Sequence, residues 1–72
     1  MREIYLCNDH DYYEIVREGL RFKLAHLTLR NGEFHTRGFI VYRPTSRRAL
    51  IEQMACNYNK VIRIDVSTIR IK

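Results

Sequence analysis

Hydrophobic and polar residues alternate at the start of the chain, in its middle and near its end. Residues 2–7 alternate with a period of two, which predicts a β-strand. Residues 9–18 are predicted to form a short helix, because Asn8-Asp9 can cap it, acidic residues follow in its early turns and Gly19 can end it. A second strand that pairs back on the first is the competing interpretation of this segment.

The strongest turn signal is Asn31-Gly32, which lies between two segments rich in hydrophobic residues, 20–30 and 33–43. This pattern predicts a β-hairpin with a type I′ turn. The hydrophobic residues of the first strand change parity half-way along it, so a β-bulge is expected near Ala25-His26. The second strand is expected to bury Phe34, Gly38, Ile40 and Tyr42 and to expose His35, Arg37, Phe39, Val41 and Arg43.

The proline that follows ends this hairpin, and Thr45 or Ser46 can cap a second helix over residues 46–57, whose apolar residues recur at helical spacing. Residues 61–72 return to a period of two and predict a final strand, with a second bulge or bend near Ser67-Thr68. The inward residues of that strand are expected to be Ile62, Ile64 and Val66.

The predicted order β-α-β-β-α-β is that of the ferredoxin-like α+β fold, in a single domain that spans residues 1–72. In this fold a four-stranded antiparallel sheet carries two helices on one face and leaves its other face open. The alternative fold is a β-rich start followed by a ββαβ unit.

The composition is that of a small globular protein, with 72 residues of which 46% are hydrophobic and 29% charged. A chain of this length buries a core of limited size, which argues against a roomy enzyme cleft. No apolar run approaches the ~20 residues of a membrane span, and residues 1–20 lack the apolar core of a signal peptide. We therefore expect a cytoplasmic protein that is not an enzyme and does not contact a membrane.

The two cysteines, Cys7 and Cys56, are too few for a disulfide framework and are expected to be buried, reduced thiols. The spacing of Cys7 and His10 resembles part of a zinc site, but the remaining ligands would have to come from distant residues. No metal and no cofactor are therefore predicted.

The net charge of +5 is unevenly distributed. Residues 1–18 contain two basic and five acidic side chains, a net −3, whereas residues 19–72 contain eleven basic and three acidic ones, a net +8. Ten of the thirteen basic residues are arginines, whose planar guanidinium groups suit phosphates and carboxylates. This charge favours nucleic acid, or an acidic protein surface, as the partner.

In the predicted fold, many of these basic residues lie on the open face of the sheet, around the aromatic rings of Tyr5 and Phe39. Bases stack on exposed rings while cations follow the phosphates, so such a surface predicts binding of single-stranded RNA or DNA.

Two short segments also resemble the RNA recognition motif family. Ile4-Tyr5-Leu6-Cys7-Asn8 is similar to the motif of its first strand, and Arg37-Gly38-Phe39-Ile40-Val41-Tyr42 to the front of its third-strand motif, with Val41 where the family has a second outward aromatic residue. The resemblance implies that Tyr5 and Phe39 stack on bases and that Arg37 contacts the backbone or a base.

The start of the second predicted helix adds further cations. Arg47 and Arg48 oppose the helix dipole there, where free backbone N–H groups and the hydroxyls of Thr45 and Ser46 can bind an anion. Alternatively, these arginines are solvated or pair with Glu52 and with the acidic N-terminal segment. The complete set of residues predicted to bind nucleic acid or a partner is Tyr5, Arg21, Lys23, Arg37, Phe39, Arg43, Arg47, Arg48 and Arg63.

The first functional hypothesis is a small non-catalytic protein that binds single-stranded nucleic acid through a basic sheet face. The second is a phage or mobile-element inhibitor, of the anti-CRISPR or antitoxin type, which binds an acidic surface of a host nucleic-acid-handling complex; the short chain beginning at Met1 and its two oppositely charged segments favour it. A small RNase-type toxin that uses His26 and His35 is a third hypothesis. Exposed edge strands predict a homodimer by edge pairing.

Overall fold

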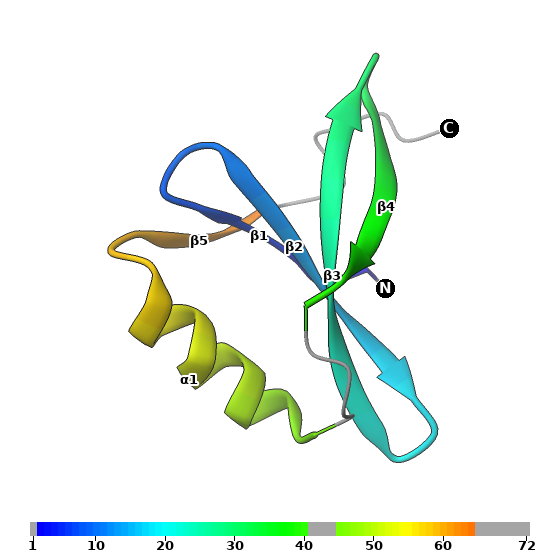
Figure 1. The fold of residues 1–72 in the computed structure, drawn as a ribbon, viewed down its shortest axis with the longest axis vertical. Coiled ribbons are helices and arrows are strands. Elements are labelled where there is room, and N and C mark those ends of the chain that lie inside the picture. Colours follow the sequence, from blue (N-terminus) through cyan, green and yellow to red (C-terminus); the bar gives the residue numbers. More distant parts are fainter. Residues whose placement is uncertain (1, 41–44, 65–72) are drawn as a thin grey trace.

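The computed structural model describes residues 2–40 and 45–64, which form one antiparallel sheet and one helix (Figure 1). The strands lie in the order β4-β3-β2-β1-β5. Tight hairpins join the first four strands, and β5 pairs with β1 after the chain has passed through the helix. The elements are β1 (Ile4–Cys7), β2 (Asp11–Glu18), β3 (Arg21–Arg30), β4 (Glu33–Phe39), α1 (Arg47–Asn57) and β5 (Val61–Ile64).

The predicted ferredoxin-like fold is wrong, because residues 11–18 form a strand that pairs with β1 and not a helix. The sheet has five strands instead of four, and the described residues contain one helix instead of two. Alternation along β2 places Tyr13 and Ile15 on one face and Tyr12 and Val16 on the other, and hydrophobic neighbours contact both pairs. Aromatic and β-branched side chains suit such a two-sided strand, whereas a helix would have buried only one narrow stripe of them.

Three tight turns connect the strands, each at a residue with positive φ. Asn8 and Asp9 have φ values of 51° and 66°, so they turn the chain between β1 and β2 and do not cap a helix. Gly19, with φ 63°, occupies the first position of the two-residue turn between β2 and β3. Asn31 and Gly32 have φ values of 52° and 77°, as the predicted type I′ turn requires, and the hairpin of β3 and β4 is confirmed.

The pairing of β3 with β4 is irregular close to the predicted bulge, but the additional residue belongs to β4. Leu27 pairs with Thr36 and His26 pairs with Gly38, which leaves Arg37 without a partner across the ladder. An additional residue in one strand bends it and changes the direction of the neighbouring side chains. Here it places Gly38, instead of Arg37, opposite His26.

Hydrophobic residues pack on both faces of the sheet. The helix-side cluster consists of Tyr5, Cys7, Tyr13, Ile15, Leu24, Leu50 and Met54, with Phe22, Ile51, Tyr58 and Val61 packed against it. The far-side cluster consists of Ile4, Ala25, Leu27 and Phe34, with Tyr12, Val16, Phe39 and Ile64 packed against it. The first half of β3 contributes to the helix-side cluster and its second half to the far-side cluster. This change of buried face explains the change in hydrophobic parity without an additional residue in β3.

The second predicted helix is confirmed as α1. Ser46 caps it, since its Oγ accepts a hydrogen bond of 3.1 Å from the backbone N–H of Ala49. Leu50 and Met54 are buried against the sheet. Thr45, just before the cap, exchanges two backbone hydrogen bonds of 2.7 Å with Phe22. This bridge attaches the start of α1 to the start of β3, while the tip of the β3–β4 hairpin extends away from the helix (Figure 1).

Several expectations for individual strand residues need correction or lie outside the described residues. Ile40 and Ile62, expected to be buried, are 42% and 43% exposed, whereas Phe39, expected to be exposed, is half-buried. The structure describes β5 as far as Ile64. Residues 65–72, with the predicted second bulge and the inward Val66, lie outside the described part of the chain, as do Val41, Tyr42 and Arg43. The outer strands of the sheet are β4 and β5, so the predicted homodimer would form along one of them.

Both cysteines have free thiols. Cys7 is buried, and burial, followed by the charge of Asp11, raises the pKa of its thiol to about 11. Cys56 is exposed on α1, so the prediction of two buried thiols is wrong for this residue. Within residues 2–40 and 45–64, no three His, Cys, Asp or Glu side chains are grouped so that they could hold a metal ion. No helix in these ranges has the length and apolar character needed to cross a membrane.

Candidate functional site

The acidic residues of the N-terminal segment are paired with basic groups and do not form an acidic surface. Ion pairs or close contacts join Glu3 to Arg47, Asp9 to Lys60, Asp11 to His26, Glu14 to Arg2 and Glu18 to Lys23. Four of these five basic partners come from residues 19–72. The acidic side chains of the N-terminal segment are therefore paired mostly with basic groups from the rest of the chain, and the net charge of +5 remains.

Glu3 is the centre of a polar cluster at the start of α1. Arg47 Nε donates hydrogen bonds of 2.9 Å to both carboxylate oxygens, and the Tyr5 hydroxyl donates one of 2.5 Å to Oε2. The hydrogen bonds from Arg47, with a smaller contribution from Tyr5, hold the pKa of Glu3 below its ordinary value. Burial, followed by the hydrogen bond to Glu3, raises the pKa of the Tyr5 hydroxyl. Arg47 therefore pairs with Glu3, which agrees with the alternative prediction that the arginines at the helix start pair with the acidic N-terminal segment.

The lowered pKa of Glu3 predicts a contribution to stability that is lost in acid. Because the folded state favours the charged carboxylate, the contribution is fully present above the pKa of the unfolded chain, about 4.3, and disappears as the pH falls through the lower pKa of the folded chain. Glu3→Gln should reduce the free energy of unfolding near neutral pH, and the difference from the parent protein should shrink towards about pH 3. Urea titrations at both pH values measure this.

The matched control for that experiment is Glu52→Gln, which removes only the exposed ion pair with Arg48 on α1. Exposed pairs of this kind contribute little, so this variant should resemble the parent protein at both pH values. A loss of stability in Glu3→Gln that is equal at both pH values would contradict the role given to the ionised carboxylate.

Tyr5 and Phe39 do not form the predicted pair of exposed rings. Tyr5 is 8% exposed and belongs to the helix-side cluster. Phe39 packs against the far-side cluster, with the Lys23 ammonium 4.0 Å from the centre of its ring. Strand pairing explains the separation, because Tyr5 lies in the same cross-strand row as Gly38, and the next residue of β4 points to the opposite face.

The other predicted site residues are distributed over several surfaces. Arg21 and Lys23 lie at the start of β3 on the far side, and Arg63 is exposed at the β5 edge. Arg48 is exposed on α1 and pairs with an acidic residue one helical turn away at 3.3 Å. Arg43 lies outside the described residues. Arg37 and Phe39, two members of the predicted set, line a common pocket.

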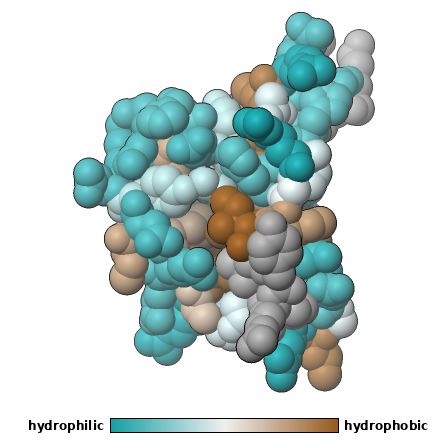
Figure 2. All heavy atoms as spheres, in the orientation of Figure 1, coloured by the Kyte–Doolittle hydropathy of each residue, from teal (hydrophilic) through white to brown (hydrophobic). Residues whose placement is uncertain are grey.

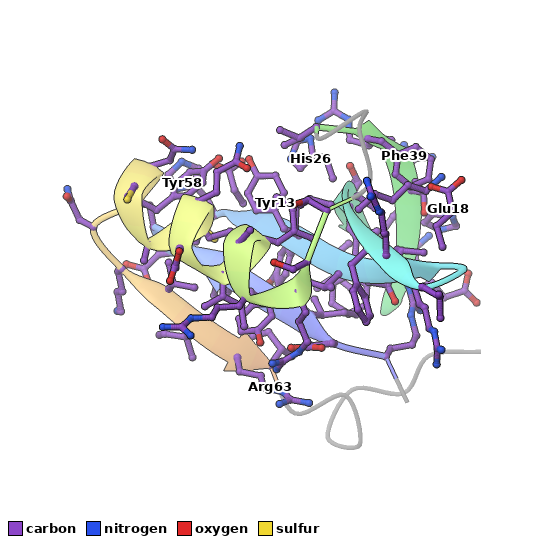
Figure 3. All side chains as sticks on the ribbon, turned by 90° about the horizontal axis from the view of Figure 1, so that it is seen from below. Tyr13, Glu18, His26, Phe39, Tyr58 and Arg63 are labelled. Atoms are coloured by element: carbon purple, nitrogen blue, oxygen red, sulfur yellow. The ribbon has the colours of Figure 1, made fainter. Side chains whose placement is uncertain are left out.

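That pocket adjoins a row of side chains that crosses the sheet on the helix side. Strand pairing places Gly38, His26, Tyr13 and Tyr5 next to one another on β4, β3, β2 and β1. The rings of His26 and Tyr13 stack with their centres 5.0 Å apart and their planes at 25° (Figure 3). The Tyr13 hydroxyl is hydrogen-bonded to the Tyr58 hydroxyl, just beyond the end of α1. Burial and then this contact raise the pKa of Tyr13, so its hydroxyl stays protonated at neutral pH.

The pocket itself has a volume of about 300 Å³ and is lined by His26, Arg37, Gly38, Phe39 and Ile40. Two features of β4 create it. Gly38 places no side chain opposite His26, and a Cβ built at Gly38 would meet no atom within 4 Å. Arg37, which precedes Gly38 and is the unpaired residue of the bulge, lines the same pocket.

Cationic and apolar groups share the lining of this pocket. Arg37 is exposed and, among the residues that the structure describes, has neither an ion pair nor a hydrogen bond. The His26 side chain is 27% exposed, with Nε2 3.7 Å from Asp11 Oδ1. The face shown in Figure 2 is mostly hydrophilic, with a hydrophobic patch near its centre. A ligand that combines negative charge with a flat apolar surface matches this lining.

His26 and Gly38 were not among the predicted binding residues. With a regular hairpin after Asn31-Gly32, His26 would pair with Arg37, so only the bulge in β4 brings the glycine opposite the imidazole. The predicted bulge in β3 is wrong, because the parity change there reflects a change of buried face, and the additional residue lies in β4. His35 pairs with Thr28, so the two histidines of the RNase hypothesis are not cross-strand partners.

Comparison of the chain with protein-family models, with curated proteins and with solved structures gave no match. The interpretation of the pocket therefore depends on its own geometry and charge.

Proposed function

We propose that this protein is a non-catalytic binding protein for single-stranded nucleic acid, and that the pocket beside the β4 bulge is its point of contact. The observation that carries the proposal is the position of Arg37, which is exposed and unpaired within the described residues, at the mouth of a pocket that also contains His26. Guanidinium groups bind phosphate through two parallel hydrogen bonds. The net charge of +5 adds long-range attraction for a polyanion.

A second cation extends this contact along β3. Arg30 has the same strand parity as His26 and is also exposed without an ion pair among the described residues. Four residues of a strand span about 13 Å, which is about the length of two nucleotides in an extended single strand. An unpaired strand suits this arrangement better than a duplex, because its bases are free to enter a pocket while its phosphates follow the cations.

Loss of the Arg37 side chain is expected to weaken binding roughly 10- to 150-fold, since a charge-assisted hydrogen bond contributes about 1.5–3 kcal/mol. Fluorescence anisotropy with a labelled single-stranded oligonucleotide of roughly ten nucleotides measures the effect at low and high salt. The parent protein should bind less tightly at high salt, and Arg37→Ala should show a smaller dependence on salt because one phosphate contact is lost.

The control is Arg17→Ala. Arg17 is exposed on β2, four residues after Tyr13, and its Nε donates a hydrogen bond to the Gly19 carbonyl oxygen. This variant has the same net charge as Arg37→Ala, so it reports the effect of charge alone. Equal losses in the two variants would show that the pocket has no special role, and flat isotherms at low salt would refute nucleic-acid binding.

The alternative of an inhibitor with an acidic and a basic surface gains no support from the charge distribution, because the acidic residues of the N-terminal segment are paired within the chain. It stays a prediction with its own test, which is capture of partners from a host lysate with and without nuclease. A stoichiometric protein partner that survives nuclease treatment would favour the inhibitor.

A further inference from the structure

The row of side chains on the helix side ends in an open position next to a fixed aromatic ring. Tyr13 is 4% exposed and is held by Tyr58, whose ring centre lies 5.4 Å from its own and whose hydroxyl it contacts. His26 stacks on Tyr13 with one face of its ring. Because the two rings stack across neighbouring strands, the other face of the imidazole is directed towards the next strand, β4, where Gly38 has no side chain.

Gly38 has no side chain, so the space above it lies where a further side chain would continue the stack of Tyr13 and His26. A Cβ at Gly38 would meet no atom within 4 Å, and the pocket of about 300 Å³ begins there. That volume is at the lower limit for small-molecule pockets, which restricts the occupant to one small group. A flat group lying over Gly38 would continue the stack that begins at Tyr13 and His26.

Phe39, although it lines the same pocket, is less suited to be the stacking surface. Lys23 Nζ lies 4.0 Å from the centre of the Phe39 ring and occupies one of its faces, and Glu18 holds the ammonium at 3.5 Å. The ring also packs against the far-side cluster. His26 therefore offers the better aromatic face for a ligand.

We propose that one unpaired nucleobase stacks on His26 in the space above Gly38, with the adjacent phosphate bound by Arg37. The ligand would then be recognised as a nucleotide, by its base as well as by its charge. The proposal rests on the proposed function, since it names the part of the nucleic acid that enters the pocket. Stacking of a base on an aromatic side chain contributes about 1–3 kcal/mol, so loss of the base should weaken binding roughly 5- to 150-fold.

The decisive experiment compares two labelled oligonucleotides of equal length, one of thymidines and one with the same sugar-phosphate backbone but without bases. The parent protein should bind the thymidine strand at least fivefold more tightly. Gly38→Val fills the space above Gly38 and should remove this preference, while binding of the abasic strand continues through Arg37. Gly38 has no positive φ, so a β-branched residue is compatible with its backbone.

A second variant and a control keep the result interpretable. His26→Ala removes the stacking surface without altering β4 and should also abolish the preference for bases; this variant decides the outcome if Gly38→Val does not fold, as judged by circular dichroism. His35→Ala removes an exposed histidine of β4 that contacts Glu33 at 3.8 Å, and its preference should match that of the parent protein.

The possible results separate the two proposals. Equal affinity of the parent protein for both strands would overturn base stacking but leave nucleic-acid binding intact, and binding of neither strand would overturn both. A preference for bases that persists in Gly38→Val and His26→Ala would also overturn base stacking at His26, because the base would then bind elsewhere.

Discussion

Leu50→Ala is expected to lower the free energy of unfolding by about 2–5 kcal/mol, which is a large part of the total for a domain of this size, roughly 4–11 kcal/mol. Leu50 is fully buried and, with Met54, forms the contact of α1 with the sheet. Truncation would leave a cavity between the two layers, because the sheet backbone cannot move in to fill it. Urea denaturation followed by circular dichroism measures the change.

Two variants of the same helix calibrate this result. Leu50→Met keeps most of the volume and should cost less than about 1.5 kcal/mol, and Gln53→Ala, at an exposed position, should change the stability by less than about 0.5 kcal/mol. If Leu50→Ala were no worse than Gln53→Ala, α1 would not be packed on the sheet as described.

Phe34→Ala should cost about 3–5 kcal/mol, although Phe34 lies on the side of the sheet opposite to α1. Its ring meets that of Tyr12 edge to face, with the centres 5.1 Å apart and the planes at 64°. The guanidinium carbon of Arg2 lies 5.9 Å from the ring centre, and Glu14 holds that guanidinium by hydrogen bonds of 2.9 and 3.0 Å. Loss of the ring would remove both contacts and open the far-side cluster.

The control for this prediction is Thr36→Ala, two residues along β4 and exposed. It should be close to neutral, whereas Phe34→Leu should retain part of the stability because it still fills much of the space. Thermal unfolding of the three variants tests whether the far-side cluster is a second core. Similar midpoints for Phe34→Ala and Thr36→Ala would show that it is not.

The two cores determine where the pocket lies. On the helix side, the tightly packed residues end at Tyr13, and the next residue of the row, His26, is partly exposed beside Gly38. The pocket is therefore at the boundary between the packed region and the β3–β4 hairpin. Figure 1 shows that the tip of this hairpin extends away from α1. At this position the side chains of Tyr13 and Tyr58 support one side of the pocket, and the other side is open to a ligand.

Local signals predicted two parts of the fold correctly. Asn31-Gly32 predicted a type I′ hairpin because few other residue pairs tolerate two consecutive positive φ values. Ser46 predicted the start of α1 because its hydroxyl replaces a missing backbone acceptor. Both features depend on residues within one turn of each other, so the surrounding structure had little influence on them.

Residues 9–18 show why other parts could not be predicted in the same way. Their acidic start and terminal Gly19 are compatible with a helix, and their aromatic and β-branched residues are compatible with a strand. The decision came from neighbours on both sides, since β1 and β3 each pair with β2 along almost its whole length. Asn8-Asp9 and Gly19 are compatible with helix ends, but here they form turns, because β1 and β3 pair with β2 on either side.

By itself, the sequence determined the turn at Asn31-Gly32, the extent of α1 and the net positive charge. Only the tertiary structure decided that Tyr5 and Phe39 lie on opposite faces, that Glu3 engages Arg47, and that Gly38 lies opposite His26. The physical reason is that side chains of a strand alternate between its faces, so one additional residue in β4 reverses every side chain beyond it. The position of such a residue depends on how β3 and β4 pair and pack in the folded sheet, which the local sequence pattern does not specify.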